Sequence, residues 1–530
     1  MKKSCLASVH AACGRPMGLV VSVLATALSA LPGPAQAVAV WSEFGGDAQH
    51  SAISGVASQA LNTIVWQTPV DLAPQFTSGD LLIHYGSALI TQANTVIVPV
   101  KVGAGGGFEV QARSGANGSL LWFQTTDYIL PQPPSDWVPG YGPALSSTNR
   151  LYFAGAGGTV YYRDTPDQAT GTSGQLAFYG LANYQASAAA YNSSVYINTP
   201  ITSDRAGNIY FGFQVVGAQP ANLTGGVAKI DANGVGTWVS AASLVAGTFK
   251  SATGAAPALS ADGSRVYFAV SDGFNGRLVQ LDTSNLALVS ASAPLTAMLD
   301  ISTASPTVGP DGDVYYGTDN GNHSRGVLNH FSADLSQAKT AASFGWDDTA
   351  SIVPRSMVPQ YQGSSSYLLL IKYNDYAGAG GTGVNRMAIV DPNNLTQIDP
   401  LTGGTVMKEI LTIAGVTPDT DFPGVPGAVR EWCINTAVVD PATGSVLVNS
   451  EDGKLYRWNL ATNSFTESIV LTGGVGEAYT PTLIGADGKV YAINNSILFA
   501  VGVPEPATAL YTLAGMAAIA ALMRRRRLQR

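Results

Sequence analysis

The residues that most often carry catalysis or bind metals are few and poorly spaced in this sequence. His323 and His330 are close together, but a separation of seven fits neither a helical nor a hairpin metal site, so both are expected to be solvated or to cap backbone groups. Asp319–Asn322 has the oxygen-rich composition of a calcium loop without its closing glutamate, which indicates a polar turn. The adjacent carboxylates Asp347 and Asp348 are expected to be solvated. The sequence has no nucleophile elbow and no His-Glu-x-x-His motif.

The three cysteines predict neither a disulfide nor a cofactor. Cys5 and Cys13 lie near the N-terminus, in a segment that we expect to be removed, and Cys433 stands alone in the rest of the chain. A single cysteine cannot form an intrachain disulfide. No histidine or aspartate is close to it in the sequence, so we expect Cys433 to be a small buried apolar residue without a metal ion or cofactor.

The first 37 residues are typical of a secretory signal peptide. Lys2, Lys3 and Arg15 make a positive start, and Met17–Leu31 is an apolar stretch too short to span a bilayer comfortably. Proline and glycine then break the helix, and small residues stand where signal peptidase requires them. We predict cleavage by signal peptidase after Ala37, with an uncleaved anchor as the alternative.

The last 28 residues combine three features in order. A rigid, extended polar motif comes first and consists of Pro504, Glu505 and Pro506. The uncharged run Ala507–Met523 follows, at the lower limit of length for a transmembrane helix. A basic cluster then holds the end of the helix in the cytoplasm by the positive-inside rule: Arg524, Arg525, Arg526 and Arg527. The body of the protein is therefore predicted to lie outside the membrane.

This three-part order resembles the PEP-CTERM sorting signal of Gram-negative bacteria, over residues 503–530. The resemblance implies processing near the Pro-Glu-Pro motif by an exosortase, a membrane protease-transferase. It also implies an intermediate anchored in the inner membrane, followed by transfer to the cell surface or to an extracellular polysaccharide matrix, as in biofilms. A plain anchor would need only the helix and the arginines.

The charge of the body excludes nucleic acid as a partner. The two ends carry eight of the 27 basic residues but only one of the 35 acidic residues, so the body is more acidic than the overall net charge of −8. An anionic surface without a basic stripe repels nucleic acid and acidic lipid. We therefore expect contact with the membrane only through the C-terminal helix, before processing.

The elements that position these residues are predicted to be short strands. Glycine is abundant at 59, charged residues make up only 12%, and tyrosine outnumbers phenylalanine by 22 to 16, which favours strands joined by tight turns. A phrase recurs in which a proline and an apolar pair precede a polar turn and a strand of the type Val-Tyr-Phe. Its prolines stand at positions 143, 200, 257, 306 and 481, and several of its turns contain Asp-Gly, a strong hairpin signal.

The spacing of this phrase predicts a β-propeller. The first four copies are 57, 57 and 49 residues apart, a period typical of propellers or repeat arrays. Weaker copies lie at Ala88–Val100, Ser351–Tyr373 and Thr436–Leu447, which makes eight. We predict an all-β propeller of eight four-stranded blades over residues 38–502, with the strand Thr63–Gln67 completing the last blade. The stretch Asp391–Arg430 is expected to be an irregular insertion in a blade loop.

A second resemblance concerns the N-terminal part of the body. The segment from Trp41 to Ser51, followed by Ile64-Val65-Trp66, looks like the opening of pyrroloquinoline-quinone-type propellers. The stretch from Ala112 to Trp122 is similar to their tryptophan-docking repeat. The resemblance implies that Trp122 wedges between neighbouring blades and that the turn at Gly118 sets its angle. The other repeats lack a tryptophan at this position.

The residues that this resemblance would require for catalysis are missing from the sequence in part. The resemblance implies that a quinoprotein dehydrogenase of this type needs a calcium site, a catalytic aspartate and usually a vicinal disulfide, and Cys433 alone cannot form the disulfide. No Cys-x-x-Cys-His motif is present to attach haem. We expect a non-catalytic binding or structural protein of the extracellular matrix without a cofactor. The alternatives are a quinoprotein-like or polysaccharide-active enzyme with a divergent site and an assembly scaffold of the outer membrane.

Overall fold

The structure is a computed structural model that describes residues 40–77, 80–82, 86–104, 106–131, 141–299, 302–473 and 478–504. The chain divides into two units, Met1–Gln36 and Ala37–Arg530, and every described residue belongs to the second. The predicted signal peptide and the predicted C-terminal helix both lie outside the described residues. Within those residues, no helix is long and apolar enough to cross a membrane.

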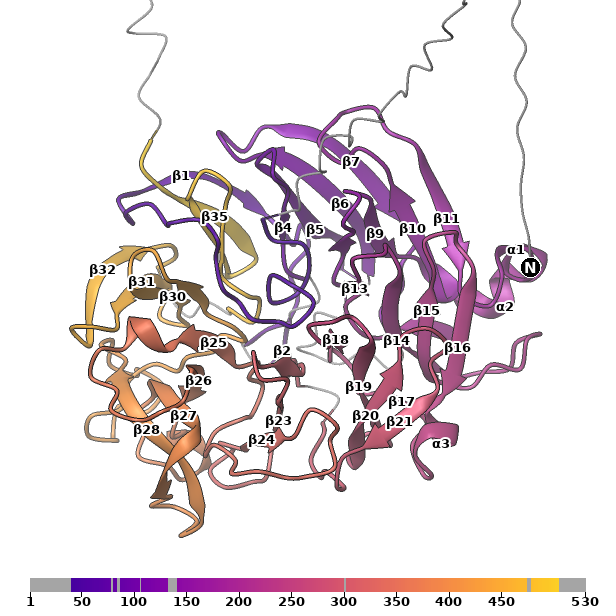
Figure 1. The fold of residues 1–530 in the computed structure, drawn as a ribbon. Coiled ribbons are helices and arrows are strands. Elements are labelled where there is room, and N and C mark those ends of the chain that lie inside the picture. The colour runs from indigo at the N-terminus through magenta and orange to yellow at the C-terminus, as the bar shows by residue number, and fades with distance from the viewer. Residues whose placement is uncertain are drawn as a thin grey trace, which may run out of the picture. The chain divides into compact units, whose positions relative to one another are not determined.

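Eight antiparallel sheets follow one another along the described chain and form the blades of a β-propeller, as predicted (Figure 1). Blade 1 contains β4 (Leu89–Ile90), β5 (Thr95–Gly103), β6 (Gly106–Ser114) and β7 (Leu120–Thr126). Blade 2 contains β8 (Ala144–Leu145), β9 (Leu151–Ala154), β10 (Thr159–Arg163) and β11 (Ser173–Ala177). Blade 3 contains β12 (Val195–Ile197), β13 (Thr202–Ser203), β14 (Ile209–Val215), β15 (Gly226–Ile230) and β16 (Gly236–Ser240). Blade 4 contains β17 (Lys250–Ser251), β18 (Ala258–Leu259), β19 (Arg265–Ser271), β20 (Gly276–Asp282) and β21 (Leu288–Ala291).

The second half of the chain repeats this arrangement. Blade 5 contains β22 (Thr307–Val308), β23 (Val314–Thr318) and β24 (Val327–Phe331). Blade 6 contains β25 (Ser351–Pro354), β26 (Tyr367–Tyr373), β27 (Arg386–Ile398) and β28 (Thr405–Ala414). Blade 7 contains β29 (Val438–Asp440), β30 (Ser445–Asn449), β31 (Lys454–Asn459) and β32 (Ser464–Val470). Blade 8 contains β33 (Leu483–Ile484), β34 (Val490–Asn494), β35 (Ile497–Gly502) and the N-terminal strand β1 (Thr63–Pro69).

The remaining elements are short. A two-stranded ribbon is formed by β2 (Phe76–Thr77) and β3 (Asp80–Leu81). The described helices are α1 (Leu181–Ala186), α2 (Ala188–Asn192), α3 (Ala241–Leu244) and the 3-10 helices η1 (Ala156–Gly158), η2 (Arg355–Met357) and η3 (Ala377–Ala379). Blade 5 has three regular strands, and two isolated bridges, Leu328 to Ala342 and Phe331 to Ala338, stand where its fourth strand would pair.

The ring closes by pairing the two ends of the described chain. Strand β1 pairs antiparallel with β35 along Thr63–Pro69, and Figure 1 shows this indigo strand beside the yellow one. The prediction that an N-terminal strand completes the last blade is confirmed. Strand β1 is therefore the outer strand of blade 8, and the pairing of the two ends of the described chain supplies the fourth strand of that blade.

The recurring tyrosine of the repeat lies between blades. Tyr210, Tyr267, Tyr315 and Tyr491 are fully buried on the second strand of their blades. Their hydroxyls reach the neighbouring blade, as when Tyr267 donates to the Ala333 carbonyl at 2.7 Å. A buried tyrosine needs a partner for its hydroxyl, and the adjacent blade supplies one. The repeat therefore encodes both the strand and its contact with the next blade.

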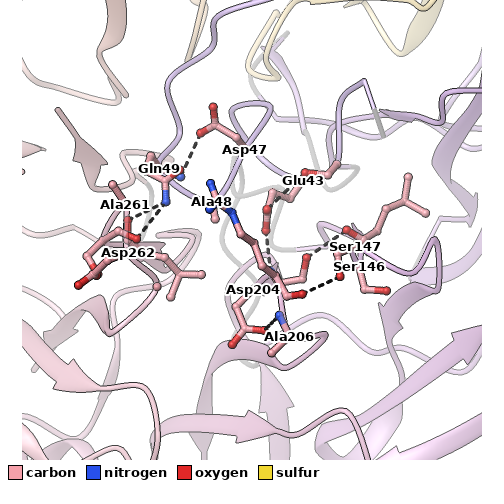
Figure 2. Close-up of a pocket in the computed structure, with 17 residues that line it drawn as sticks. Glu43, Asp47, Ala48, Gln49, Ser146, Ser147, Asp204, Ala206, Ala261 and Asp262 are labelled. Atoms are coloured by element: carbon pink, nitrogen blue, oxygen red, sulfur yellow. Dashed lines mark hydrogen bonds between the residues drawn. The ribbon is translucent and has the colours of Figure 1, made fainter. Parts of the chain in front are cut away.

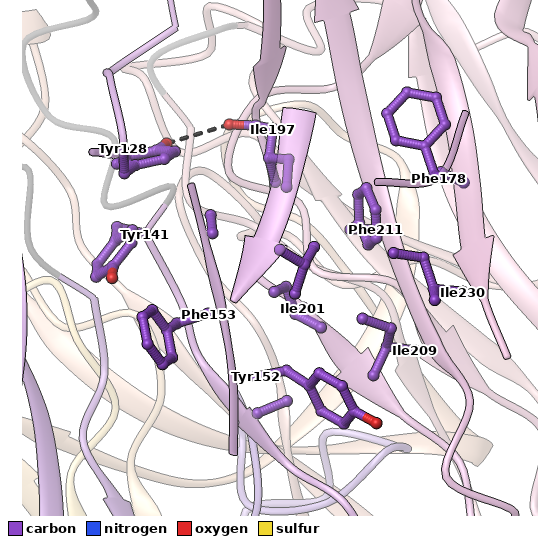
Figure 3. Close-up of a cluster of buried hydrophobic side chains, with 14 of the residues drawn as sticks. Tyr128, Tyr141, Tyr152, Phe153, Phe178, Ile197, Ile201, Ile209, Phe211 and Ile230 are labelled. Atoms are coloured by element: carbon purple, nitrogen blue, oxygen red, sulfur yellow. Dashed lines mark hydrogen bonds between the residues drawn. The ribbon is translucent and has the colours of Figure 1, made fainter. Parts of the chain in front are cut away.

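The largest hydrophobic cluster joins blades 1 to 3. Figure 3 shows rings and branched side chains from these blades packed together, including Phe153, Phe178 and Phe211. The Tyr128 hydroxyl donates to the Ile197 carbonyl at 3.1 Å, so this cluster also contains a satisfied polar group.

The prediction of an irregular insertion at Asp391–Arg430 is wrong in its first part. Strands β27 and β28 occupy Arg386–Ile398 and Thr405–Ala414 and form a long antiparallel hairpin. The register shifts between Asp391 and Thr396, where the Asp391 carboxylate accepts backbone hydrogen bonds from Asn393, Asn394 and Leu395. A bulge of this kind interrupts the alternation of side chains, which hides the strand from pattern analysis.

Candidate functional site

The segment Val40–Gln59, which we call the collar, bonds to all eight blades in order. It contacts the innermost strand of blades 1 to 7 and the first turn of blade 8. The contacts are Trp41 with Ile90, Ser42 with Leu145, Glu43 with Ser203, Ala48 with Leu259, Gln49 with Val308, Ser51 with Ile352, Ala52 with Val439 and Gln59 with Gly488. Apart from that of the Glu43 carboxylate, these are backbone–backbone bonds of 2.7 to 3.0 Å.

The collar explains the opening motif that sequence analysis singled out. Trp41 is completely buried and forms an antiparallel bridge with Ile90 of blade 1. His50 is also completely buried, and burial lowers its pKa to about 4, so its neutral ring donates from Nδ1 to the Pro306 carbonyl at 2.6 Å. These side chains fill the centre of the ring, and no signal in the local sequence placed them there.

A pocket of about 350 Å³, the collar pocket, lies between the collar and the first turns of blades 2, 3 and 4 (Figure 2). Figure 2 shows Glu43, Asp47 and Gln49 of the collar beside the turns that carry Ser147 and Asp262. Its polar lining consists of hydroxyl, carboxylate and amide groups with one guanidinium: Ser42, Glu43, Asp47, Gln49, Ser146, Ser147, Ser203, Asp204, Arg205, Ser260 and Asp262.

Glu43 anchors the floor of this pocket. Its Oε2 atom accepts the Ser203 backbone N–H at 2.6 Å, and Ser42 Oγ lies 3.4 Å from Oε1. Burial raises the pKa of Glu43 well above its usual value, although the Ser203 hydrogen bond opposes the shift. The carboxyl therefore keeps its proton at pH values where an exposed glutamate is ionised. Within the described lining, no serine is paired with a histidine base, so the pocket offers hydrogen bonding and not nucleophilic catalysis.

A second pocket, the acidic cavity, has a volume of about 260 Å³ and lies at the opposite end of the inner strands, on blades 5 to 8. The linkers that enter blades 6, 7 and 8 line it together with the loops that follow β23 and β26. Its lining is Ser324, Trp346, Asp347, Lys372, Tyr376, Gly378, Ala379, Glu431, Cys433 and Tyr479.

The prediction that Asp347 and Asp348 are solvated is wrong, because both are buried beside this cavity. Asp347 Oδ1 accepts hydrogen bonds from the backbone and hydroxyl of Thr303, and Asp348 Oδ2 accepts the Lys372 backbone N–H at 3.3 Å. Burial raises the pKa of both carboxyls, and that of Asp348 is raised well above its usual value. The linker between blades 5 and 6 turns both residues into the ring, which the acidic composition of the chain did not indicate.

The prediction that Cys433 is buried is confirmed, but its side chain lies beside two glutamates, whereas the sequence analysis considered only histidine and aspartate as neighbours. Cys433 is buried, and its Sγ lies 2.9 Å from Glu451 Oε2 and 3.7 Å from Glu431 Oε2. Burial raises the pKa of both glutamates, and their mutual repulsion raises that of Glu431 further. Glu431 is two residues from the cysteine in sequence, so this neighbour was visible; Glu451 reaches the site from the turn between β30 and β31.

The two histidines do not meet, and His330 is not solvated. His330 is buried, with Nε2 2.9 Å from Asp313 Oδ2 and its ring stacked on Tyr315. His323 is half-buried, with Nδ1 3.3 Å from Asp375 Oδ1. The Asp319–Asn322 segment is an exposed polar turn between β23 and β24, in which Asp319 caps backbone N–H groups.

Trp122 lies between blades 1 and 2. Its indole N–H donates to the Pro166 carbonyl at 2.7 Å, and the Arg163 guanidinium lies 4.1 Å from the ring centroid. Gly118 has φ +74°, and a Cβ atom there would stand 2.7 Å from the ring of Trp66. Trp66 therefore packs between blades 8 and 1, as Trp122 packs between blades 1 and 2.

Trp66 is the docking tryptophan that sequence analysis missed. Its indole N–H donates to the Gly115 carbonyl at 3.0 Å, across the closing seam of the ring. The sequence placed Trp66 in the opening motif and in a closing strand but gave it no docking role, because the rest of its blade lies more than 400 residues away in the sequence.

Of the residues predicted for processing, only Pro504 lies within the described part, where it is exposed after β35. Ala37, Glu505 and Pro506 lie outside the described residues. So do the four residues predicted to set membrane topology: Arg524, Arg525, Arg526 and Arg527.

Comparison with known proteins supports the fold alone. No protein-family model matches the chain, and no curated protein matches it. Among solved structures, a europium-containing methanol dehydrogenase aligns over 86% of this chain and 90% of its own, with a TM-score of 0.53 and 9% identity. The quinohemoprotein alcohol dehydrogenase of Comamonas testosteroni aligns over 88% and 81%, with a TM-score of 0.50 and 12% identity. A quinohemoprotein alcohol dehydrogenase of Pseudomonas putida HK5 aligns over 88% and 80%, with a TM-score of 0.51 and 10% identity.

Neither pocket fits the quinone that the resemblance to this fold implies. Pyrroloquinoline quinone carries several carboxylates and needs cationic partners. In the described lining of the collar pocket, Arg205 is the one cation, among Glu43 and three aspartates. In the acidic cavity, Lys372 faces Asp347 and Glu431. An anionic quinone would meet carboxyl groups in both places, so no chemistry of that cofactor is assigned to this chain.

Proposed function

We propose that this chain is an exported, non-catalytic propeller that binds a hydroxyl-rich saccharide of the extracellular matrix in the collar pocket. The observation that carries the proposal is the lining of that pocket, where serine hydroxyls, carboxylates and an amide converge on about 350 Å³. Such groups supply the donors and acceptors that vicinal sugar hydroxyls require. The volume falls within the range of small-molecule sites.

The collar makes this pocket rigid. Gln49 donates from Nε2 to the Leu259 carbonyl at 3.1 Å, and Ser147 Oγ donates to the Arg205 carbonyl at 2.9 Å. Groups held in this way lose little side-chain entropy when a ligand binds. A preformed polar pocket without a nucleophile suits recognition better than turnover.

Export and sorting complete the proposal. Signal peptidase removes residues 1–37, and an exosortase acts near Pro504, Glu505 and Pro506 while the C-terminal helix anchors the chain in the inner membrane. The body then reaches the cell surface or the polysaccharide matrix. N-terminal sequencing of the exported protein tests the first step, with Val38 expected as the first residue. A first residue of Met1 in exported material would contradict it.

The acidic cavity favours one alternative, a polysaccharide-active enzyme. The buried Asp347 carboxyl and the half-buried Glu431 carboxyl have raised pKa values, as catalytic acids often do. Release of reducing sugar from matrix polysaccharide, lost in Asp347→Asn, would support the enzyme. Dye reduction with an added primary alcohol would instead support a quinoprotein-like activity.

Binding to the collar pocket can be tested with a matched pair of variants. A glycan array of neutral oligosaccharides selects the probe, and calorimetry with the full-length chain measures its affinity. Asp262 lines the pocket, whereas Asp334 stands in a turn with the same Ser-x-Asp-x-Ser pattern outside it. We expect Asp262→Ala to weaken binding by about threefold to tenfold, the value of one hydrogen bond. Asp334→Ala is expected to leave the affinity unchanged.

Two outcomes would overturn this proposal. One is an equal loss of affinity in both variants, which would reflect a general effect on blade turns. The other is an array on which no neutral glycan binds the full-length chain.

A further inference from the structure

We propose that Glu431, Cys433 and Glu451 form a binding site for a divalent transition-metal ion of the zinc class, open on one side to the acidic cavity. The three side chains each offer one ligand atom, and these atoms all lie within 4.8 Å of one another. The proposal is independent of the collar pocket, which lies at the other end of the inner strands.

The distances suit a tetrahedral ion. With a metal–sulfur distance of about 2.3 Å and a metal–oxygen distance of about 2.0 Å, a sulfur and an oxygen ligand stand about 3.5 Å apart. The two sulfur-to-oxygen distances around Cys433 are 2.9 Å and 3.7 Å, on either side of this value. The third pair of ligand atoms, the two carboxylate oxygens, also lies within 4.8 Å, so all three atoms surround a common space.

The fold holds the three ligands from two directions. Glu431 and Cys433 flank Trp432, whose backbone N–H donates to Asn374 Oδ1 at 3.2 Å and whose ring packs into the core of blade 7. Glu431 and Cys433 both line the acidic cavity, so both ligands face it. Glu451 comes from the β30–β31 turn, and the Arg430 guanidinium lies 3.6 Å from its Oε1 atom. A cation in this position orients a ligating carboxylate.

Lys372 is the independent observation that points to a ligand in this cavity. Its side chain is almost fully buried and lines the cavity, yet among the described residues its Nζ atom donates no hydrogen bond. The nearest carboxylate oxygen, Asp347 Oδ2, lies 4.0 Å away. Lys372 therefore has an ion-pair partner, but its Nζ keeps N–H donors that no described acceptor uses. A water, hydroxide or small anion on the open side of the metal ion would supply that acceptor.

The ligand types select the class of ion. A thiolate is a soft ligand, which calcium and magnesium avoid and zinc, cobalt and iron accept. Two carboxylates and one thiolate carry three negative charges, and a divalent ion neutralises most of them. Three protein ligands with one open position match the arrangement of reactive rather than structural zinc sites.

The test uses Co²⁺ and Zn²⁺ on the reduced, full-length chain after treatment with a chelator. We expect one equivalent of Co²⁺ to bind with a near-ultraviolet thiolate-to-cobalt absorption band, and Zn²⁺ to displace it. Cys433→Ser should abolish the band. Because outer-shell changes alone cost about tenfold to 100-fold in affinity, loss of a direct ligand in Glu451→Gln should weaken Zn²⁺ binding by at least about tenfold.

The control is Glu409→Gln, a glutamate on β28 that bonds to Gln397 and lies outside the cavity lining. It should bind both ions like the unaltered chain, and circular dichroism should show that every variant keeps the same fold. The proposal fails if Co²⁺ binds without the sulfur band, if Cys433→Ser retains the band, or if Ca²⁺ binds more tightly than Zn²⁺. Because Glu451→Gln keeps the thiol, it remains decisive if Cys433→Ser does not fold.

Discussion

Substitutions of Trp66 test how much the junction between blades 8 and 1, where the ring closes, contributes to the stability of the fold. Trp66 lies on β1, is 8% exposed, and contacts the turn of blade 1 across the junction between the two chain ends. Trp122 is 7% exposed and makes the same type of contact between blades 1 and 2. The two tryptophans therefore form a matched pair that differs in the seam each one closes.

The contacts of Trp66 set the expected loss in the free energy of unfolding for each variant. Trp66→Phe removes the indole N–H and part of the buried bicyclic ring, whereas the Gly115 carbonyl still faces the Tyr491 hydroxyl at 3.3 Å. We expect a loss of about 1 to 3 kcal/mol in the free energy of unfolding, because the acceptor keeps a second donor but the smaller ring leaves a void. Trp66→Ala also leaves a cavity against Gly118 and Tyr491, so we expect a loss of about 3 to 5 kcal/mol.

Urea unfolding followed by circular dichroism measures these losses, and hydrogen exchange locates them. Trp122→Ala should cost a similar free energy, because burial and hydrogen bonding are alike. Only Trp66→Ala should speed exchange in both β1 and β35, since these strands come from opposite ends of the chain and β1 can detach from blade 8 while its other three strands stay paired. A loss below about 1 kcal/mol in Trp66→Ala, or equal exchange of β1 and β35 in both variants, would refute this account of ring closure.

Three further predictions follow from single sites. Gly118→Ala should destabilise the fold by about 1 kcal/mol or more in urea unfolding, because φ is +74° and the added Cβ meets a ring. Burial raises the pKa of Asp313, but hydrogen bonds from His330 and Lys339 outweigh this effect and hold the pKa below its usual value. Asp313 therefore contributes stability at neutral pH, and this stability is lost as the pH falls below about 4. Asp313→Asn should flatten this acid limb of the stability profile; an unchanged limb would contradict the assignment. Glu505→Ala should leave unprocessed protein in the inner membrane in a fractionation blot of the native host, whereas equal processing would indicate a plain anchor.

The blade repeats could be predicted because their signals are local. The phrase that leads from Pro257 to Tyr267 contains its own turn and strand, and its counterparts became β18 and β19 or their equivalents in every blade. The weaker copies at Ala88–Val100, Ser351–Tyr373 and Thr436–Leu447 also lie on the first two strands of blades. Side-chain alternation and turn residues act over fewer than about ten residues, so they survive in a single sequence.

The hairpin of blade 6 could not be predicted from local sequence patterns. The bulge at Asp391 breaks the alternation of β27, and the glycines and prolines nearby imitate a loop. The strand forms because its backbone pairs along both neighbours, β26 and β28. Pairing partners that lie outside the local window outweigh local propensity.

By itself, the sequence determined the fold class, the eight repeats, the closing strand and the acidic character of the body. Tertiary structure alone decided the collar, the burial of Asp347 and Asp348, and the meeting of Glu431 and Cys433 with Glu451. These features depend on the centre of the ring, where inner strands hundreds of residues apart converge. The environment of a side chain there, and so its charge state and its partners, is set by the blades opposite it and not by its neighbours in the chain.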